Sequence, residues 1–216
     1  MSRRNYWELA AFAAVLVADA FGYVPLTLTV GLLPVVWFML RQAGEPWSSV
    51  GLKMPTNLPR ALVIGSVAGV AIELLAVFGT TPWISKLFGT EPDYSDLAFI
   101  RGNLKYLLVF LTLNWTLAAF GEEICWRGFL MQRVARLLGS GNAAWLLSLL
   151  LVSALFGWVH SEQGVAGAVQ ESLSGFLLGV LFLVTGRNLT VPIVAHGVSN
   201  TVAFVLIYLG RYPGLN

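Results

Sequence analysis

The sequence is poor in charged residues, histidine and cysteine. Only 11% of its 216 residues are Asp, Glu, Lys or Arg, whereas an ordinary soluble domain is roughly a quarter charged. A chain with so little charge cannot cover a water-exposed surface with polar side chains. The single cysteine, Cys125, excludes an internal disulfide and any metal site built from several thiolates.

Hydrophobic residues make up 57% of the chain, and its mean hydropathy is +0.75. Several stretches without charge approach the roughly 20 residues that a helix needs to cross hydrocarbon. They are residues 20–40, 106–121, 137–159 and 188–210. We therefore predict an all-α, polytopic transmembrane bundle. Because spans and short loops use most of the chain, one integral membrane domain over residues 1–216 is expected.

We expect about seven transmembrane helices, between six and eight, because each needs roughly 20 apolar residues. They are predicted near residues 7–23, 26–40, 60–79, 104–121, 143–160, 165–185 and 189–209. The fourth should continue toward Leu138, because no proline interrupts it before the turn at residues 139–141.

The basic residues predict the orientation, since short cytoplasmic loops are enriched in Lys and Arg. Most of them fall at alternate ends of successive spans. They are Arg3, Arg4, Arg41, Lys53, Arg60, Arg133, Arg136 and Arg187. We predict a multi-pass protein of the cytoplasmic membrane, with its amino terminus inside and its carboxyl terminus outside. Because these residues are scattered, nucleic acid is not expected as a partner.

Ionisable residues in or beside apolar runs are costly and by default indicate function. Glu123 and Arg127 are four residues apart, so we expect them to pair on one helix face. Glu122 then points in another direction and stays available for chemistry. The chain has only two histidines, His160 and His196, and both lie near the ends of apolar runs.

Two further pairs repeat the four-residue spacing. Phe156 and His160 would share a face, so that the phenyl ring limits the rotamers of the imidazole. His196 and Asn200 would present an imidazole and a carboxamide side by side. Three helices would thus each offer one polar face to a common site.

The heights of these residues can be compared by counting from the turns. Glu122 and His160 are equally far from the turn at residues 139–141, so in an antiparallel hairpin they lie at the same level. His196 lies about 13 Å inside the link at Arg187. His196 lies at the level of Glu122 and His160 if the tip of their hairpin projects beyond the link at Arg187. The apolar run at residues 143–152, which follows the tip, must then pack against the bundle. We expect the site nearer the cytosolic face.

Glu122, His160, His196 and Asn200 together supply what amide hydrolysis needs. The Glu122 carboxylate can take a proton from water. His160 can hold the same water or pass the proton to the leaving amine. His196 and Asn200 can donate hydrogen bonds to the developing oxyanion. The ion pair between Glu123 and Arg127 would hold these four residues in place.

A zinc site is the alternative chemistry. Glu122, His160 and His196 would form a two-histidine, one-glutamate set that leaves a fourth position for water. The His-Glu-x-x-His helix motif is absent, and the ligands would come from separate helices. The sequence does not decide between a glutamate base and zinc-bound water, and we favour the reaction without a metal cofactor.

Three motifs carry a resemblance to a known family. Residues 122–127, Glu-Glu-Ile-Cys-Trp-Arg, resemble the Glu-Glu-x-x-x-Arg motif of the CAAX protease and bacteriocin-processing family, also called the Abi family. Residues 156–160, Phe-Gly-Trp-Val-His, resemble its Phe-x-x-x-His motif, and residues 196–200, His-Gly-Val-Ser-Asn, its His-x-x-x-Asn motif. The order and separation of the motifs also match. The resemblance covers residues 105–207.

This resemblance implies an intramembrane endopeptidase like the type II CAAX prenyl proteases, whose prenyl-processing members remove three residues after a prenylated cysteine. By motif position, Glu122 is the base, His160 its water-holding partner, and His196 with Asn200 the oxyanion side. The partners it implies are membrane lipid and a membrane-associated or lipidated peptide. Members have been described both as metalloproteases and as glutamate proteases, so the metal question stays open.

Other polar residues are expected to have structural roles. Asp19 and Glu73 would each make one interhelical hydrogen bond or carry a proton. Glu162 and Glu171 would face solvent, and Cys125 would be a packing residue. Two other functions remain compatible: a non-catalytic bacteriocin-immunity or membrane binding protein, and a small transporter. Composition does not separate lipid-facing from partner-facing surfaces, so no oligomeric state is predicted.

Overall fold

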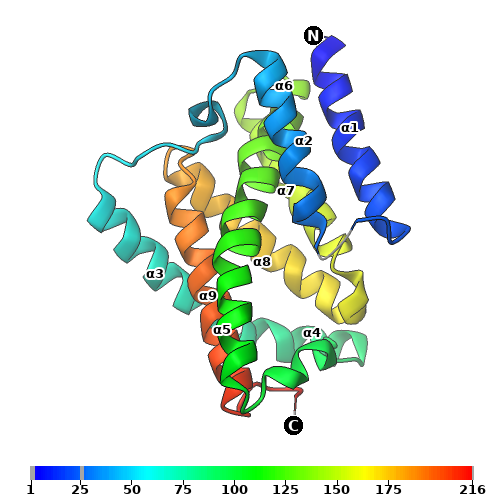
Figure 1. The fold of residues 1–216 in the computed structure, drawn as a ribbon, viewed down its shortest axis with the longest axis vertical. Coiled ribbons are helices and arrows are strands. Elements are labelled where there is room, and N and C mark those ends of the chain that lie inside the picture. Colours follow the sequence, from blue (N-terminus) through cyan, green and yellow to red (C-terminus); the bar gives the residue numbers. More distant parts are fainter. Residues whose placement is uncertain (1–2, 25–26, 216) are drawn as a thin grey trace.

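The structure is a computed structural model that describes residues 3–24 and 27–215. Over these residues the regular structure is entirely helical (Figure 1). The α-helices are α1 (Arg3–Ala20), α2 (Leu28–Ala43), α3 (Leu58–Leu75), α4 (Thr81–Phe88), α5 (Leu104–Leu113), α6 (Met131–Leu137), α7 (Asn142–Trp158), α8 (Gly164–Val184) and α9 (Thr190–Tyr208). Short 3-10 turns are η1 (Trp47–Val50), η3 (Ser95–Ile100) and η5 (Ser161–Gln163). The predicted all-α fold is confirmed.

Among the described residues, four continuous helical segments are long and apolar enough to cross a membrane. They are Leu58–Phe88, Leu104–Leu137, Ser161–Val184 and Thr190–Tyr208. The shorter apolar helices Leu28–Ala43 and Asn142–Trp158 correspond to two more of the predicted spans. The remaining predicted span is α1, whose apolar run Glu8 and Asp19 interrupt. The chain is therefore an all-α helical membrane bundle.

The helix that carries Glu122 continues from Leu104 to Leu137, as predicted, but its middle is not α-helical. Between α5 and α6 lies the π-helical segment η4 (Asn114–Leu130). A second, short π-helical segment, η2 (Ala76–Thr80), joins α3 to α4. In π-helices the hydrogen bonds run from i to i+5, and such segments are rare and frequently occur at functional sites.

Close contact between α3 and α9 depends on two glycines. A β-carbon on Gly69 would collide with the carbonyl oxygen of Ala195, and one on Gly65 would collide with the side chain of Val194. Small residues at such positions let membrane helices approach each other closely. The contact fixes the height of α3 against α9, which places Glu73, one turn after Gly69, beside the carboxyl-terminal half of α9.

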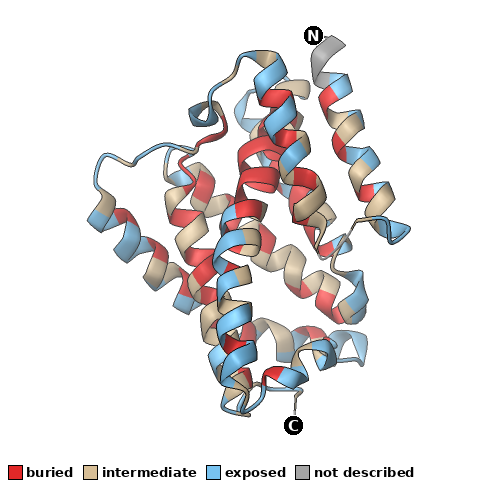
Figure 2. Cartoon of the chain, viewed as in Figure 1, coloured by how far each residue is buried: buried red, intermediate tan, exposed pale blue. Residues whose placement is uncertain are grey.

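Buried residues gather along η4 in the middle of the bundle (Figure 2), and helix α7 packs there along one side and leaves its other side exposed. Leu149, Val152 and Phe156 are buried in the main apolar core. Residues on the opposite side, including Leu147 and Leu151, are exposed, as expected for a face in contact with lipid. The apolar run at residues 143–152 therefore packs against the bundle. This packing is what a projecting hairpin tip requires, so the comparison of levels is consistent with the structure.

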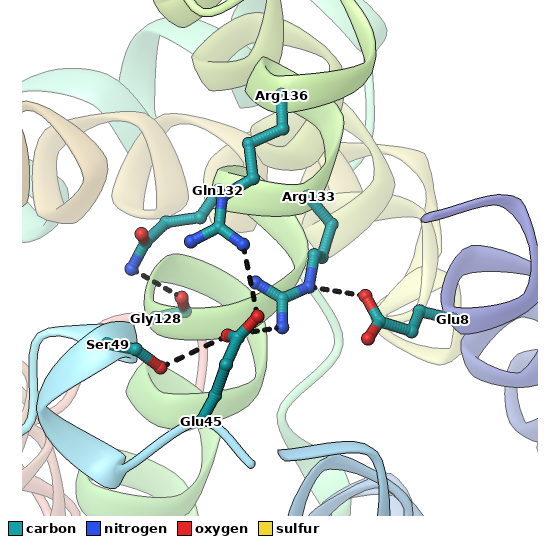
Figure 3. Close-up of polar contacts among 7 residues, drawn as sticks. All are labelled: Glu8, Glu45, Ser49, Gly128, Gln132, Arg133 and Arg136. Atoms are coloured by element: carbon teal, nitrogen blue, oxygen red, sulfur yellow. Dashed lines mark hydrogen bonds and ion pairs between the residues drawn. The ribbon is translucent and has the colours of Figure 1, made fainter. Parts of the chain in front are cut away.

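Arg133 is buried, whereas its position in the sequence predicts an exposed cytoplasmic loop. Its Nε lies 2.6 Å from Oε2 of Glu8 in α1, and its Nη2 lies 2.9 Å from Oε2 of Glu45, which follows α2 (Figure 3). Arg136 approaches the second oxygen of Glu45 at 3.6 Å. These ion pairs join three parts of the chain: α1, the link that follows α2, and α6. Arg133 is buried because α1 and this link cover the end of α6 that carries it.

Candidate active site

One cavity brings together all four residues predicted to perform catalysis. Its volume is about 210 Å³. Glu122 reaches it from the π-helical segment η4, His160 from the residue before η5, and His196 and Asn200 from α9. Segments far apart in the sequence therefore converge on one site, and Glu122 and His160 face the same space, as the hairpin arithmetic predicts.

The Glu122 carboxylate is available to a ligand. Its side chain is partly exposed, whereas the neighbouring residues Gly121 and Glu123 are buried. Among the described residues, no hydrogen bond or ion pair engages it. A carboxylate held at a cavity without a protein partner can accept a hydrogen bond, or a proton, from a bound water.

Glu123 and Arg127 form the predicted ion pair and also support His196. Oε1 of Glu123 accepts a hydrogen bond from Nη1 of Arg127 at 2.8 Å and one from Nδ1 of His196 at 2.9 Å. Nη2 of Arg127 donates to the carbonyl oxygen of Gly175 at 3.0 Å, and its guanidinium lies 4.5 Å from the centre of the Phe156 ring. The pair thus connects η4 to α7, α8 and α9.

The hydrogen bonds of the two imidazoles assign their protons. Nδ1 of His160 lies 2.7 Å from the carbonyl oxygen of Phe156, and the two rings lie 4.7 Å apart. A carbonyl oxygen only accepts, so Nδ1 carries the hydrogen and Nε2 keeps a lone pair. His196 has the same arrangement, because the Glu123 oxygen that it contacts also accepts from Arg127. His196 can therefore donate from Nε2 only when it is protonated.

The proposed zinc ligands do not form a metal-binding group in this structure. Over the described residues, no three His, Cys, Asp or Glu side chains are close enough together to hold one ion. Glu122, His160 and His196 line the same cavity, but their donor atoms are not arranged around a common point at ligand distance.

Comparison with family models identifies the part of the chain that carries these residues. Residues 104–202 match the family described as type II CAAX prenyl endopeptidase, Rce1-like. These residues form an Rce1-like domain. The domain contains all three motifs, which confirms the resemblance they carry, and it indicates a CAAX-type intramembrane protease. Comparisons with curated proteins and with solved structures gave no match.

Two acidic residues of the cavity differ from their predicted roles. Glu73 accepts an interhelical hydrogen bond from Ser199 at 2.9 Å, as predicted, but it also lines the cavity from outside the Rce1-like domain. Glu171 was expected to face solvent, and this is wrong. It lies in the second turn of α8, is half-buried and lines the cavity. Glu162 is exposed and Cys125 is buried in the core, as predicted.

Two tyrosines that the sequence analysis did not single out close one side of the cavity. The rings of Tyr94 and Tyr212 meet edge to face with their centres 5.5 Å apart. Burial raises the pKa of each phenol well above its usual range, so both stay neutral. Both also line a second cavity of about 260 Å³, which Val77, Pro82 and Pro213 help to form. The two tyrosines therefore lie between this second cavity and the cavity that holds Glu122.

The cavity lies toward the end of the bundle that holds the carboxyl terminus (Figure 1). Lys53 lies at the other end, where its carbonyl oxygen accepts a hydrogen bond from Asn188. The predicted orientation, with the amino terminus inside and the site nearer the cytosolic face, stays a prediction.

Proposed function

We propose that the protein is an intramembrane endopeptidase that hydrolyses a peptide bond in a membrane-associated or lipidated peptide. The observation that carries this proposal is the convergence of Glu122, His160, His196 and Asn200 on one cavity. Their position within an Rce1-like domain supports it. A buried cavity with a free carboxylate and two oriented imidazoles is what hydrolysis by activated water requires.

The first step is attack by water. In the proposed reaction, Glu122 takes one proton from a water whose other hydrogen bonds to Nε2 of His160. The water oxygen forms a bond to the peptide carbonyl carbon, and the electron pair of the C=O double bond moves to its oxygen. The hydrogen bond from Nδ1 of His160 to Phe156 supports this role, because it leaves Nε2 as the acceptor.

The second step is collapse of the tetrahedral intermediate. The carboxamide of Asn200 donates to the oxyanion, and His196 donates as well when it is protonated, with Glu123 holding its Nδ1 hydrogen. The carbon–nitrogen bond breaks, its electron pair passes to nitrogen, and Glu122 returns its proton to the leaving amine. A new carboxyl group and a free amine result, and the Glu122 carboxylate is restored.

We propose that this reaction uses no metal ion. The Glu122 carboxylate supports a glutamate base, because it lines the cavity and no hydrogen bond within the described residues engages it. Each step above can be performed by the side chains themselves.

The test is cleavage of a mixed library of membrane-anchored and prenylated peptides by purified protein in detergent. The wild type is compared with Glu122→Gln, with and without a chelator, and with Glu162→Gln as an exposed control. We expect cleavage by the wild type and the control, none by Glu122→Gln, and no effect of the chelator. Loss on chelation that zinc restores would instead assign a metal mechanism. Absence of wild-type cleavage would favour the immunity or binding function.

A further inference from the structure

The cavity contains a carboxylate that the proposed reaction does not use. The side chain of Glu73 is buried, with 6% of its surface exposed. Its Oε2 accepts the hydrogen bond from Ser199, and the phenol of Tyr212 also interacts with the carboxylate, whereas Oε1 is buried and has no hydrogen-bond partner among the described residues. Such an oxygen is costly to bury alone, and a hydrogen-bond donor on a ligand would satisfy it.

The charges around the cavity have one sign. Glu73, Glu122 and Glu171 all line it, and none of the described residues that line it is Lys or Arg. The guanidinium of Arg127, one of the buried cations of the helix that carries Glu122, is already engaged by Glu123 and by Gly175. A cavity lined by charge of one sign attracts ligands of the opposite sign.

Glu73 lies near the residue that is expected to bind the oxyanion. Its partner Ser199 is the neighbour of Asn200 in α9, so Glu73 lies on the side of the cavity where the oxyanion is expected. Both Glu73 and Glu122 line a space of about 210 Å³. Because a peptide extends by at most ~3.6 Å per residue, a group at Glu73 belongs to a residue close to the cleaved bond.

We propose that Glu73, together with Glu171, forms a subsite for a positively charged side chain of the peptide substrate, within a few residues of the cleaved bond. This inference rests on the proposed endopeptidase function and adds a substrate class to it. A lysine ammonium or an arginine guanidinium supplies the donors that Oε1 of Glu73 lacks.

The test uses matched membrane-anchored peptides that differ at one residue near the cleaved bond. That residue is lysine, norleucine or glutamate, and the three peptides are otherwise identical. For the wild type we expect kcat/KM to be at least ~10-fold higher with lysine than with glutamate, since a tenfold ratio needs only ~1.4 kcal/mol.

Glu73→Gln should reduce the lysine-to-glutamate ratio, because glutamine keeps an oxygen for Ser199 but carries no charge. Glu171→Gln should reduce it as well. Glu162→Gln, which removes an exposed carboxylate outside the cavity, should leave the ratio unchanged. Equal cleavage of the lysine and glutamate peptides by the wild type, or an unchanged ratio in Glu73→Gln, overturns the proposal.

A binding measurement separates this inference from the proposed function. The three peptides are titrated against the Glu122→Gln variant and against Glu122→Gln/Glu73→Gln, without any need for turnover. Tighter binding of the lysine peptide that is lost in the double variant supports the subsite, and equal affinities overturn it. If the wild type cleaves none of the peptides, the proposed function fails, and the charge preference in binding is judged separately.

Discussion

The buried ion pair between Glu123 and Arg127 should dominate the stability of the site. The side chains are 0% and 2% exposed, so neither charge can be compensated by water if its partner is removed. Removing one member of a buried pair typically costs about 3–5 kcal/mol, because the remaining charge is buried alone. We expect losses of this size for Glu123→Gln and for Arg127→Met.

The double variant Glu123→Gln/Arg127→Met tests this reasoning. With both charges removed, its loss should be well below the sum of the two single losses. The assay is a double-mutant cycle of unfolding free energies in detergent, with wild type, both single variants and the double variant. Losses that add to within ~0.5 kcal/mol would refute the reasoning, because residues without direct coupling add in this way.

Three other changes have defined outcomes. Gly69→Ala should destabilise the protein by about 1–3 kcal/mol in thermal unfolding, because the added carbon meets the Ala195 carbonyl; Gly141→Ala, where nothing lies within 4 Å, is the control. Arg133→Met should destabilise the protein because it removes the ion pairs with Glu8 and Glu45, and loosening of α1 should appear as faster proteolysis of the amino-terminal segment. Because burial raises the pKa of Tyr212 above 10.0, the contribution of this residue to stability should be constant below pH ~10 and fall above it, and Tyr212→Phe should reduce the loss of stability above pH ~10.

The helices could be predicted from the sequence because the membrane leaves few alternatives. Backbone groups in hydrocarbon must bond within the chain, so long runs without charge are helices. The π-helical geometry of η4 could not be predicted, since its residues do not differ in type from those of an α-helix. The burial of Arg133 was also inaccessible, because it depends on α1 and Glu45 covering α6.

The spacing of the motif residues was enough to predict that they lie close together. The residues on the other side of the cavity, Glu73, Tyr94 and Tyr212, could not be predicted in this way. Glu122 and His160 share a hairpin, so counting residues from its turn relates their heights. Glu73 comes from α3, whose height against α9 is set by the glycine contacts. Tyr94 and Tyr212 lie in segments without periodicity. An intramembrane carboxylate is nevertheless a signal, and it marked Glu73 as unusual before its position was known.

The most direct test of Glu122 as the base is hydrolysis of one cleaved peptide in heavy-oxygen water, followed by mass spectrometry of both products. The wild type should place a heavy oxygen atom in the new carboxyl group, with or without a chelator. Glu122→Gln, folded to the same melting temperature, should yield no labelled product. Labelling by Glu122→Gln at the wild-type rate would contradict the assignment of Glu122 as the group that activates water.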